Sequence, residues 1–171
     1  RDERLKAKEH GKEILARYYD TFHPKHGEPV VLERMFSLTL AAATKNKRYV
    51  ISGKIDRIDK KGDVYEVIDY KTGKMPIESK LKKSLQLGLY ALAVMDKQFL
   101  GIAQNRIILT YYYLDANKKF SIEAHKRDLD EVTEAVVDTL ATLETGNFSP
   151  QKGVHCDWCS FKPICPAWEI S

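Results

Sequence analysis

The chain lacks the features that mark membrane, secreted and repetitive proteins. Its 171 residues contain no apolar run long enough to cross a bilayer and no signal-peptide pattern, so we expect a cytoplasmic protein without a membrane partner. Only three cysteines are present, all after residue 155, which argues against a disulfide framework. No internal repeat or low-complexity segment appears, which excludes solenoid architectures.

The composition is that of a folded protein with a mild positive charge. Apolar residues make up 43% of the chain, and its length suffices for one core and a small appended unit. The net charge of +4 and the pI of about 8.8 are compatible with a phosphate-backbone partner without demonstrating one. The chain opens on Arg1 within a helical pattern, so we expect a domain of a longer protein.

Hydrophobic periodicity predicts an α/β fold. Helices and strands are expected in the order α-βββ-α-ββ-α, which predicts a mixed sheet flanked by helices. The expected helices cover 3–20, 78–96 and 128–144, and the expected strands cover 30–43, 48–59, 64–71, 105–114 and 119–125.

Two neighbouring strands end in acidic residues. Asp56 precedes a hairpin turn at 60–63, and Asp69 and Lys71 follow it. Side chains alternate along a strand, so Asp69 and Lys71 project to one face and Tyr70 to the other. Antiparallel pairing through the turn places Asp56 beside Asp69. Two carboxylates and an ammonium group suit Mg²⁺ or Mn²⁺ and the hydrolysis of a phosphodiester.

The other acidic residues of this hairpin have a simpler interpretation. Asp59 and Asp63 flank the turn, and we expect both to be solvated. Asp69 differs because it follows Val67 and Ile68. A carboxylate in that place is expected to be partly buried and to need a partner or a metal ion.

Three segments in this order resemble the PD-(D/E)xK nuclease superfamily, in its RecB-like branch, and in particular the nuclease domains of AddB-like helicase–nucleases. The matching segments are 53–59, 68–73 and 86–90, followed by a C-terminal cysteine cluster, and the resemblance covers roughly residues 30–168. It implies a restriction-endonuclease-like nuclease core in residues 1–150. Residues 151–171 are then a small cysteine-rich extension.

The resemblance also assigns roles at the site. Asp56 and Asp69 become metal ligands with the Tyr70 backbone carbonyl, and Lys71 becomes the catalytic lysine. Gln86 and Tyr90 share a helix face because they are four residues apart, and they become the motif that flanks the active site. Taken without the resemblance, the two residues are better interpreted as a surface glutamine and a core tyrosine with its hydroxyl at the rim.

Two further residues are candidate metal ligands by the same resemblance. Glu33 stands where the RecB-like branch often has a glutamate, although a solvated residue fits its surroundings as well. His10 is the histidine available on the first helix, where the branch often places a ligand, and the histidine of the branch can also precede Arg1.

The cysteines are Cys156, Cys159 and Cys165, with the spacing C-x2-C-x5-C. Three cysteines in a cytosolic chain indicate a metal or cluster, and the resemblance implies a [4Fe–4S] cluster in the intact protein. Such a cluster takes four thiolates, so the fourth ligand lies outside this chain or is of another kind. Zinc held by three cysteines and a histidine is the rival, with His155, His10, His23 or His26 as the candidates. A tail without any cluster is the third possibility.

The sequence therefore predicts a metal-dependent DNA nuclease, an exonuclease by resemblance, that serves DNA repair or recombination beside a helicase. DNA that is single-stranded or has free ends is the expected partner. A cluster of lysines near the site could follow a strand of nucleic acid: Lys71, Lys74, Lys80, Lys82 and Lys83. The alternatives are an inert nuclease-like DNA-binding module, a CRISPR-adaptation-type iron–sulfur exonuclease, and a junction resolvase or restriction-type endonuclease.

Overall fold

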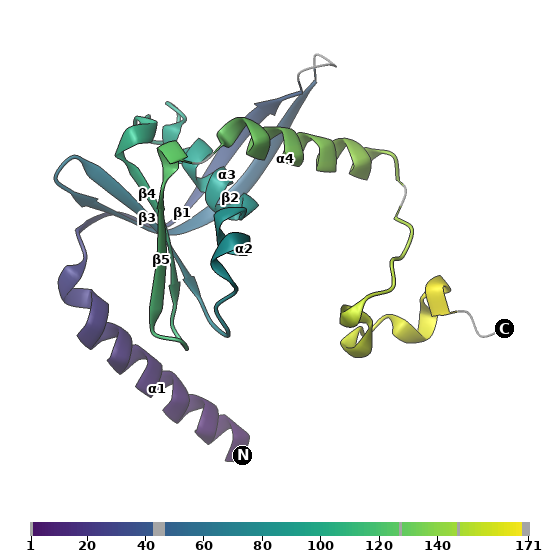
Figure 1. Ribbon diagram of the computed structural model, residues 1–171, viewed down its shortest axis with the longest axis horizontal. Helices are drawn as coiled ribbons and strands as arrows, with labels where there is room; N and C mark the ends of the chain where they lie inside the picture. The colour runs from purple at the N-terminus through teal and green to yellow at the C-terminus, as the bar shows by residue number, and fades with distance from the viewer. Residues whose placement is uncertain (1, 43–46, 127, 147, 169–171) are drawn as a thin grey trace. The chain divides into compact units, whose positions relative to one another are not determined.

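The computed structural model describes residues 2–42, 47–126, 128–146 and 148–168 (Figure 1). Its internal contacts divide the chain into two compact units, residues 1–137 and 138–171. The predicted boundary near residue 150, between nuclease core and cysteine tail, stays a prediction. Within the described ranges, none of the helices combines the length and apolarity needed to span a bilayer.

A five-stranded mixed sheet forms the centre of the first unit (Figure 1). Its strands lie side by side in chain order: β1 (Glu28–Ala41), β2 (Arg48–Lys61), β3 (Val64–Lys71), β4 (Ile107–Tyr113) and β5 (Lys118–Glu123). All neighbours are antiparallel except β3 and β4, which are parallel. A parallel step requires a crossover, and the chain between Lys71 and Ile107 supplies it. The predicted α/β fold with a mixed sheet is confirmed.

Four α-helices accompany the sheet: α1 (Asp2–Phe22), α2 (Glu78–Lys82), α3 (Leu85–Met95) and α4 (Leu129–Glu144). The prediction of one helix over 78–96 is wrong, because the segment forms two helices separated at Lys83 and Ser84. The hydroxyl of Ser84 accepts a hydrogen bond from the Leu87 backbone N–H at 3.4 Å. Ser84 is therefore the N-cap that starts α3 afresh. The predicted first strand ends at Ala41, and residue 43 lies outside the described residues.

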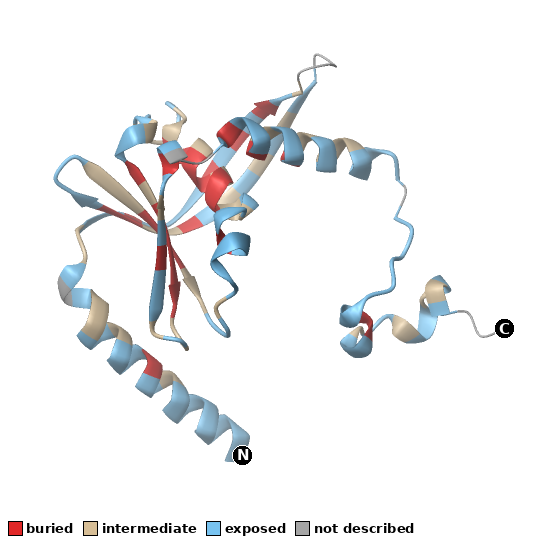
Figure 2. Cartoon of the chain, viewed as in Figure 1, coloured by how far each residue is buried: buried red, intermediate tan, exposed pale blue. Residues whose placement is uncertain are grey.

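The core lies around strands β3 and β4 (Figure 2). Val67, Ile68 and Leu109 are fully buried, as strands covered on both faces require. On one face, α3 contributes the buried side chains of Leu87 and Val94. On the other face, α1 places the ring of Tyr18 within 6 Å of the rings of Tyr70 and Tyr112.

The prediction that Asp59 is a solvated turn residue is wrong. Strand β2 continues past Asp59 to Lys61, so Asp59 pairs with Glu66 inside the sheet and is only 1% exposed. Its carboxylate lies 2.6 Å from the Arg57 guanidinium and 3.1 Å from His26. Asp63, which was also expected to be solvated, is exposed in the turn.

The second unit has little regular structure beyond the end of α4. Its cysteine segment forms three short 3-10 turns at Val154–Trp158, Lys162–Ile164 and Pro166–Trp168. The ammonium groups of Lys152 and Lys162 both lie over the ring of Trp168, at 4.4 and 4.6 Å. Cation–π contacts therefore tie the turns of this segment to one another.

Candidate active site

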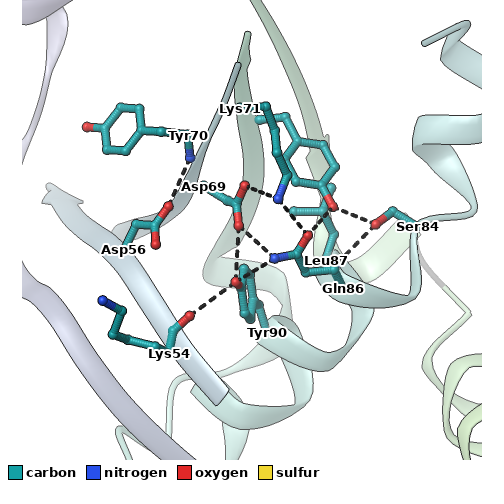
Figure 3. A network of polar contacts seen from close by, with 10 residues as sticks. Lys54, Asp56, Asp69, Tyr70, Lys71, Ser84, Gln86, Leu87 and Tyr90 are labelled. Carbon is teal, nitrogen blue, oxygen red and sulfur yellow. Dashed lines mark hydrogen bonds and ion pairs between the residues drawn. The ribbon is translucent and has the colours of Figure 1, made fainter. Parts of the chain in front are cut away.

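Alternation along β3 brings Asp69 and Lys71 together (Figure 3). Both side chains face α3, and the Lys71 Nζ lies 2.7 Å from the Asp69 Oδ2. Tyr70 faces the other way, toward Tyr18 of α1. This is the arrangement that strand geometry predicts, and it places a carboxylate and an ammonium group at one point.

Asp56 reaches the same point from β2. The sheet register pairs Arg57 with Ile68, so the residue before Arg57 stands opposite the residue after Ile68. The Asp56 Oδ2 accepts a hydrogen bond from the Tyr70 backbone N–H at 3.1 Å (Figure 3). The structure thus places the two predicted carboxylates, Asp56 and Asp69, opposite each other on neighbouring strands.

The backbone of β3 adds an oxygen on the side of Asp56. Lys71 directs its carbonyl toward β4, where it accepts from the Leu114 N–H at 2.8 Å. Successive residues of a strand direct their backbone groups to opposite neighbours. The Tyr70 carbonyl therefore points toward β2, the side on which its N–H meets Asp56.

Gln86 connects the two partners of the ion pair. Its Nε2 donates to the Asp69 Oδ1 at 2.8 Å, and its Oε1 accepts from the Lys71 Nζ at 2.9 Å. Tyr90 lies one turn further along α3, and its hydroxyl is 3.1 Å from the same Asp69 oxygen and from the Lys54 carbonyl. Because the Gln86 amide donates to Asp69 and accepts from Lys71, it fixes the orientation of both side chains.

Burial dominates the electrostatics of Asp69, which is 3% exposed. Loss of solvent raises the pKa of its carboxyl above the usual value, and the neighbouring Asp56 raises it further. The Lys71 ammonium and the Tyr90 hydroxyl oppose this shift. A second cation beside Asp69 would therefore stabilise its ionised form.

The donor set fits a hard divalent cation. The Asp69 Oδ2 is buried and makes no hydrogen bond of good geometry with the described residues, although the Lys71 ammonium lies close to it. Within the described ranges, no three His, Cys, Asp or Glu side chains gather closely enough to hold an ion. Two carboxylates and one backbone oxygen nevertheless match Mg²⁺, which keeps several waters.

The structure does not bring the two additional candidate ligands to this point. Glu33 is an exposed residue of β1 that forms an ion pair with Lys54, and it has a positive φ of 48°. His10 lies 3.0 Å from Asp115 at the turn between β4 and β5. Their assignment as metal ligands stays a prediction.

The three cysteines lie in the second unit and form no disulfide. Cys156 is buried, whereas Cys159 and Cys165 are partly exposed. The Cys156 Sγ accepts from the Gly153 backbone N–H at 3.4 Å. In the described part of the chain, they do not form a three-ligand metal group. The iron–sulfur cluster, the zinc site and the tail without a cluster all remain open.

The sequence did not predict a chain of polar contacts on the face of β3 that is opposite Asp69 and Lys71. It runs from Asp59 to His26, from His26 to the Tyr18 hydroxyl, and from there to the Tyr70 hydroxyl at 2.9 Å. One signal was available: Arg57 and Asp59 are two residues apart on a strand and must share a face. Their partners on α1 and at His26 depend on tertiary contacts that no local pattern contains.

Comparison with known proteins identifies the family and the fold of the chain. The sequence profile of the PD-(D/E)XK nuclease superfamily matches residues 3–166, which is most of the chain. A solved structure of SSO0001 superposes with a TM-score of 0.51 at 20% identity, over 92% of this chain and 67% of that one. No curated protein sequence matches the chain. The mixed sheet with its flanking helices is accordingly a restriction-endonuclease-like core, and the chain belongs to the PD-(D/E)XK nuclease superfamily.

Proposed function

We propose that this domain is a divalent-metal-dependent deoxyribonuclease that hydrolyses phosphodiester bonds with Asp56, Asp69 and Lys71. The observation that carries the proposal is the convergence on Asp69. Its buried Oδ2 lies 2.7 Å from the Lys71 ammonium, and Asp56 reaches the same end of β3. Paired carboxylates can hold a divalent cation, and an ammonium group beside them can stabilise the negative charge that develops when a phosphodiester is hydrolysed.

Each residue of the site has a role that follows from its chemistry. Asp56, Asp69 and the Tyr70 carbonyl would hold Mg²⁺ or Mn²⁺, and the bound ion supplies a polarised water and a positive charge beside the phosphate. The Lys71 ammonium lies at the edge of this group and stabilises the negative charge that develops on the phosphate oxygens. Gln86 and Tyr90 keep the Asp69 carboxylate in one orientation through hydrogen bonds to its Oδ1.

The finer features of the proposal come from the resemblance to RecB-like nucleases. By that resemblance the domain is an exonuclease that acts on DNA with free ends, and it works in repair or recombination fused to or bound by a helicase. The exposed lysines near α2 support a polyanionic partner, because surface ammonium groups attract the phosphate backbone.

The test is digestion of end-labelled single-stranded and double-stranded DNA with Mg²⁺ or Mn²⁺. An exonuclease is supported if mononucleotides or short end fragments are the products at the earliest time points. Early products of all lengths support an endonuclease instead. The Asp69→Ala variant controls for contaminating nucleases. If folded protein binds DNA but does not cleave it, the inert binding module is favoured.

For the cysteine segment we propose that Cys156, Cys159 and Cys165 bind three irons of a [4Fe–4S] cluster in the intact protein. Their spacing within one short segment supports a shared metal group. The test is anaerobic purification of the full-length protein, followed by measurement of iron, acid-labile sulfide and zinc. Four irons per protein are expected, whereas stoichiometric zinc without iron would establish the rival site.

A further inference from the structure

A groove lies next to Gln86 and Tyr90, the two residues that hold Asp69, and the roles above assign it no ligand. Its volume is about 440 Å³, within the range of ~300–1,000 Å³ common for small-molecule sites. It lies between the β1–β2 hairpin and α3. The residues that line it are Phe36, Ile51, Ser52, Gly53, Lys54, Gln86, Leu89 and Tyr90.

Asp56, Asp69 and Lys71 do not line the groove, but two of its lining residues contact Asp69. Gln86 and Tyr90 line the groove and also bind the Asp69 Oδ1, at 2.8 and 3.1 Å. The backbone of Lys54, another lining residue, is joined to the Tyr90 hydroxyl at 3.1 Å. A phosphodiester bound at Asp69 therefore has one of its neighbouring nucleosides next to this groove.

The lining suits a nucleoside that continues into a phosphate chain. Phe36 forms an apolar wall, and a Cβ at position 53 would lie 2.7 Å from its ring, so glycine is required there to let the ring lie against β2. Leu89 adds partly exposed apolar surface from α3. Lys54 has a half-exposed ammonium group, paired with Glu33, that can turn to a phosphate.

We propose that this groove is a nucleoside subsite, which receives the base and sugar adjacent to the scissile phosphate. The proposal rests on the proposed nuclease function and names the part of the DNA substrate that the domain holds beyond the reacting group. The apolar side chains of the lining can contact any of the four bases, because such contacts do not depend on the hydrogen-bonding groups that distinguish one base from another. The subsite consequently binds DNA without strong sequence preference.

The first experiment fills the groove. Leu89→Trp adds bulk at the middle of its lining, and Leu85→Trp makes the same change one turn earlier on α3, at a residue outside the groove. Each variant is assayed with a single-stranded oligonucleotide and with methyl p-nitrophenyl phosphate, a diester without a nucleoside. We expect Leu89→Trp to lower kcat/KM for DNA roughly tenfold more than for the small diester. Leu85→Trp should lower neither selectively.

Equal losses on both substrates, or no loss on either, would overturn the subsite. Because Leu89→Trp can disturb folding, Ser52→Glu serves as a second variant: it places a negative charge at an exposed lining residue of β2. It should show the same selective loss for DNA, and retention of DNA cleavage would count against the subsite.

A binding measurement separates this proposal from the nuclease function. Both tryptophan changes are made in an Asp69→Asn background, and binding of a fluorescent single-stranded oligonucleotide is followed by anisotropy without cleavage. The subsite predicts roughly tenfold weaker binding for Leu89→Trp than for Leu85→Trp. Equal affinities refute it whether or not the parent protein cleaves DNA. Selective weakening with no cleavage by the parent protein would keep the subsite and reject the nuclease.

Discussion

The hydroxyl of Tyr18 lies 2.9 Å from the hydroxyl of Tyr70 and thereby joins α1 to β3, the strand that carries the proposed catalytic residues Asp69 and Lys71. Tyr70 is held at two points, because its backbone N–H donates to Asp56 of β2 while its ring packs edge-on against the Tyr18 ring. The Tyr18 hydroxyl also contacts the His26 imidazole. Helix α1 therefore supports the position of Tyr70 from behind the active site.

Tyr18→Phe should destabilise the domain. The substitution keeps the ring but removes the hydroxyl that connects His26 and Tyr70, which leaves two partly buried polar groups without this partner. The expected loss in free energy of unfolding is about 1–3 kcal/mol, measured by urea denaturation. Tyr19→Phe is the matched control, because Tyr19 is 58% exposed on the same helix and should change stability little. Equal effects of the two variants would contradict the support that Tyr18 provides.

The stability of the domain should fall in mild acid because of His26. Burial lowers the pKa of His26 below 6.5, and the nearby Arg57 charge lowers it further, against the opposing effect of Asp59 and Glu66. The unfolded chain then binds a proton more readily than the folded one. The stabilisation is complete above the unfolded pKa of 6.5 and is lost as pH falls below it.

This pH dependence can be assigned by substitution. In urea denaturation at several pH values, His26→Gln should lose much of the decline in stability between about pH 7 and pH 5. His125→Gln should retain the decline, because His125 is 46% exposed. The other charged and titratable groups that face His26 are retained in both variants: Arg57 and Asp59 on β2, Glu66 on β3, Tyr112 on β4, Tyr18 on α1 and the neighbouring His23. A decline that persists unchanged in His26→Gln would refute the assignment.

Lys71→Met should slow cleavage without abolishing metal binding. The ammonium group lies beside the Asp69 carboxylate but is not itself a ligand. Removal of one electrostatic contact to the transition state lowers rates by about 10²–10³, which a single-turnover assay measures. The Mg²⁺-induced rise in thermal stability should survive. Lys12→Met, at an exposed residue of α1 outside the lysine cluster, is the control that should cleave at nearly the parent rate.

Asp69→Asn should abolish cleavage and yet raise stability in the absence of metal. Burial raises the pKa of Asp69, so its ionised form costs folding free energy at neutral pH, and a neutral amide removes that cost. Mg²⁺ should stabilise the parent protein by about 2.7 kcal/mol at a hundredfold excess over Kd, and should not stabilise the variant. Asp63→Asn, in the exposed turn, should behave as the parent. Equal Mg²⁺ responses of parent and Asp69→Asn in a thermal melt would exclude Asp69 as a ligand.

Local sequence rules were sufficient to predict contacts between residues that are close in the chain. The two-residue period of a strand predicted the shared face of Asp69 and Lys71. A short turn, which the structure places at residues 62–63, brings Asp56 opposite Asp69. The same rules failed at Asp59, because its burial depends on His26, which is 33 residues earlier in the chain. Residue spacing also could not show that His10 would meet Asp115 instead of the catalytic pair.

The amino-acid sequence by itself determined the order of helices and strands, except for the break between α2 and α3, and the approach of three polar side chains, because periodicity and turn length act over a few residues. Only the tertiary structure decided which groups surround them: the amide of Gln86 between Asp69 and Lys71, the support from Tyr18, and the groove along Phe36 and Leu89. These arise where elements distant in the chain pack together, and their geometry is set by the whole core.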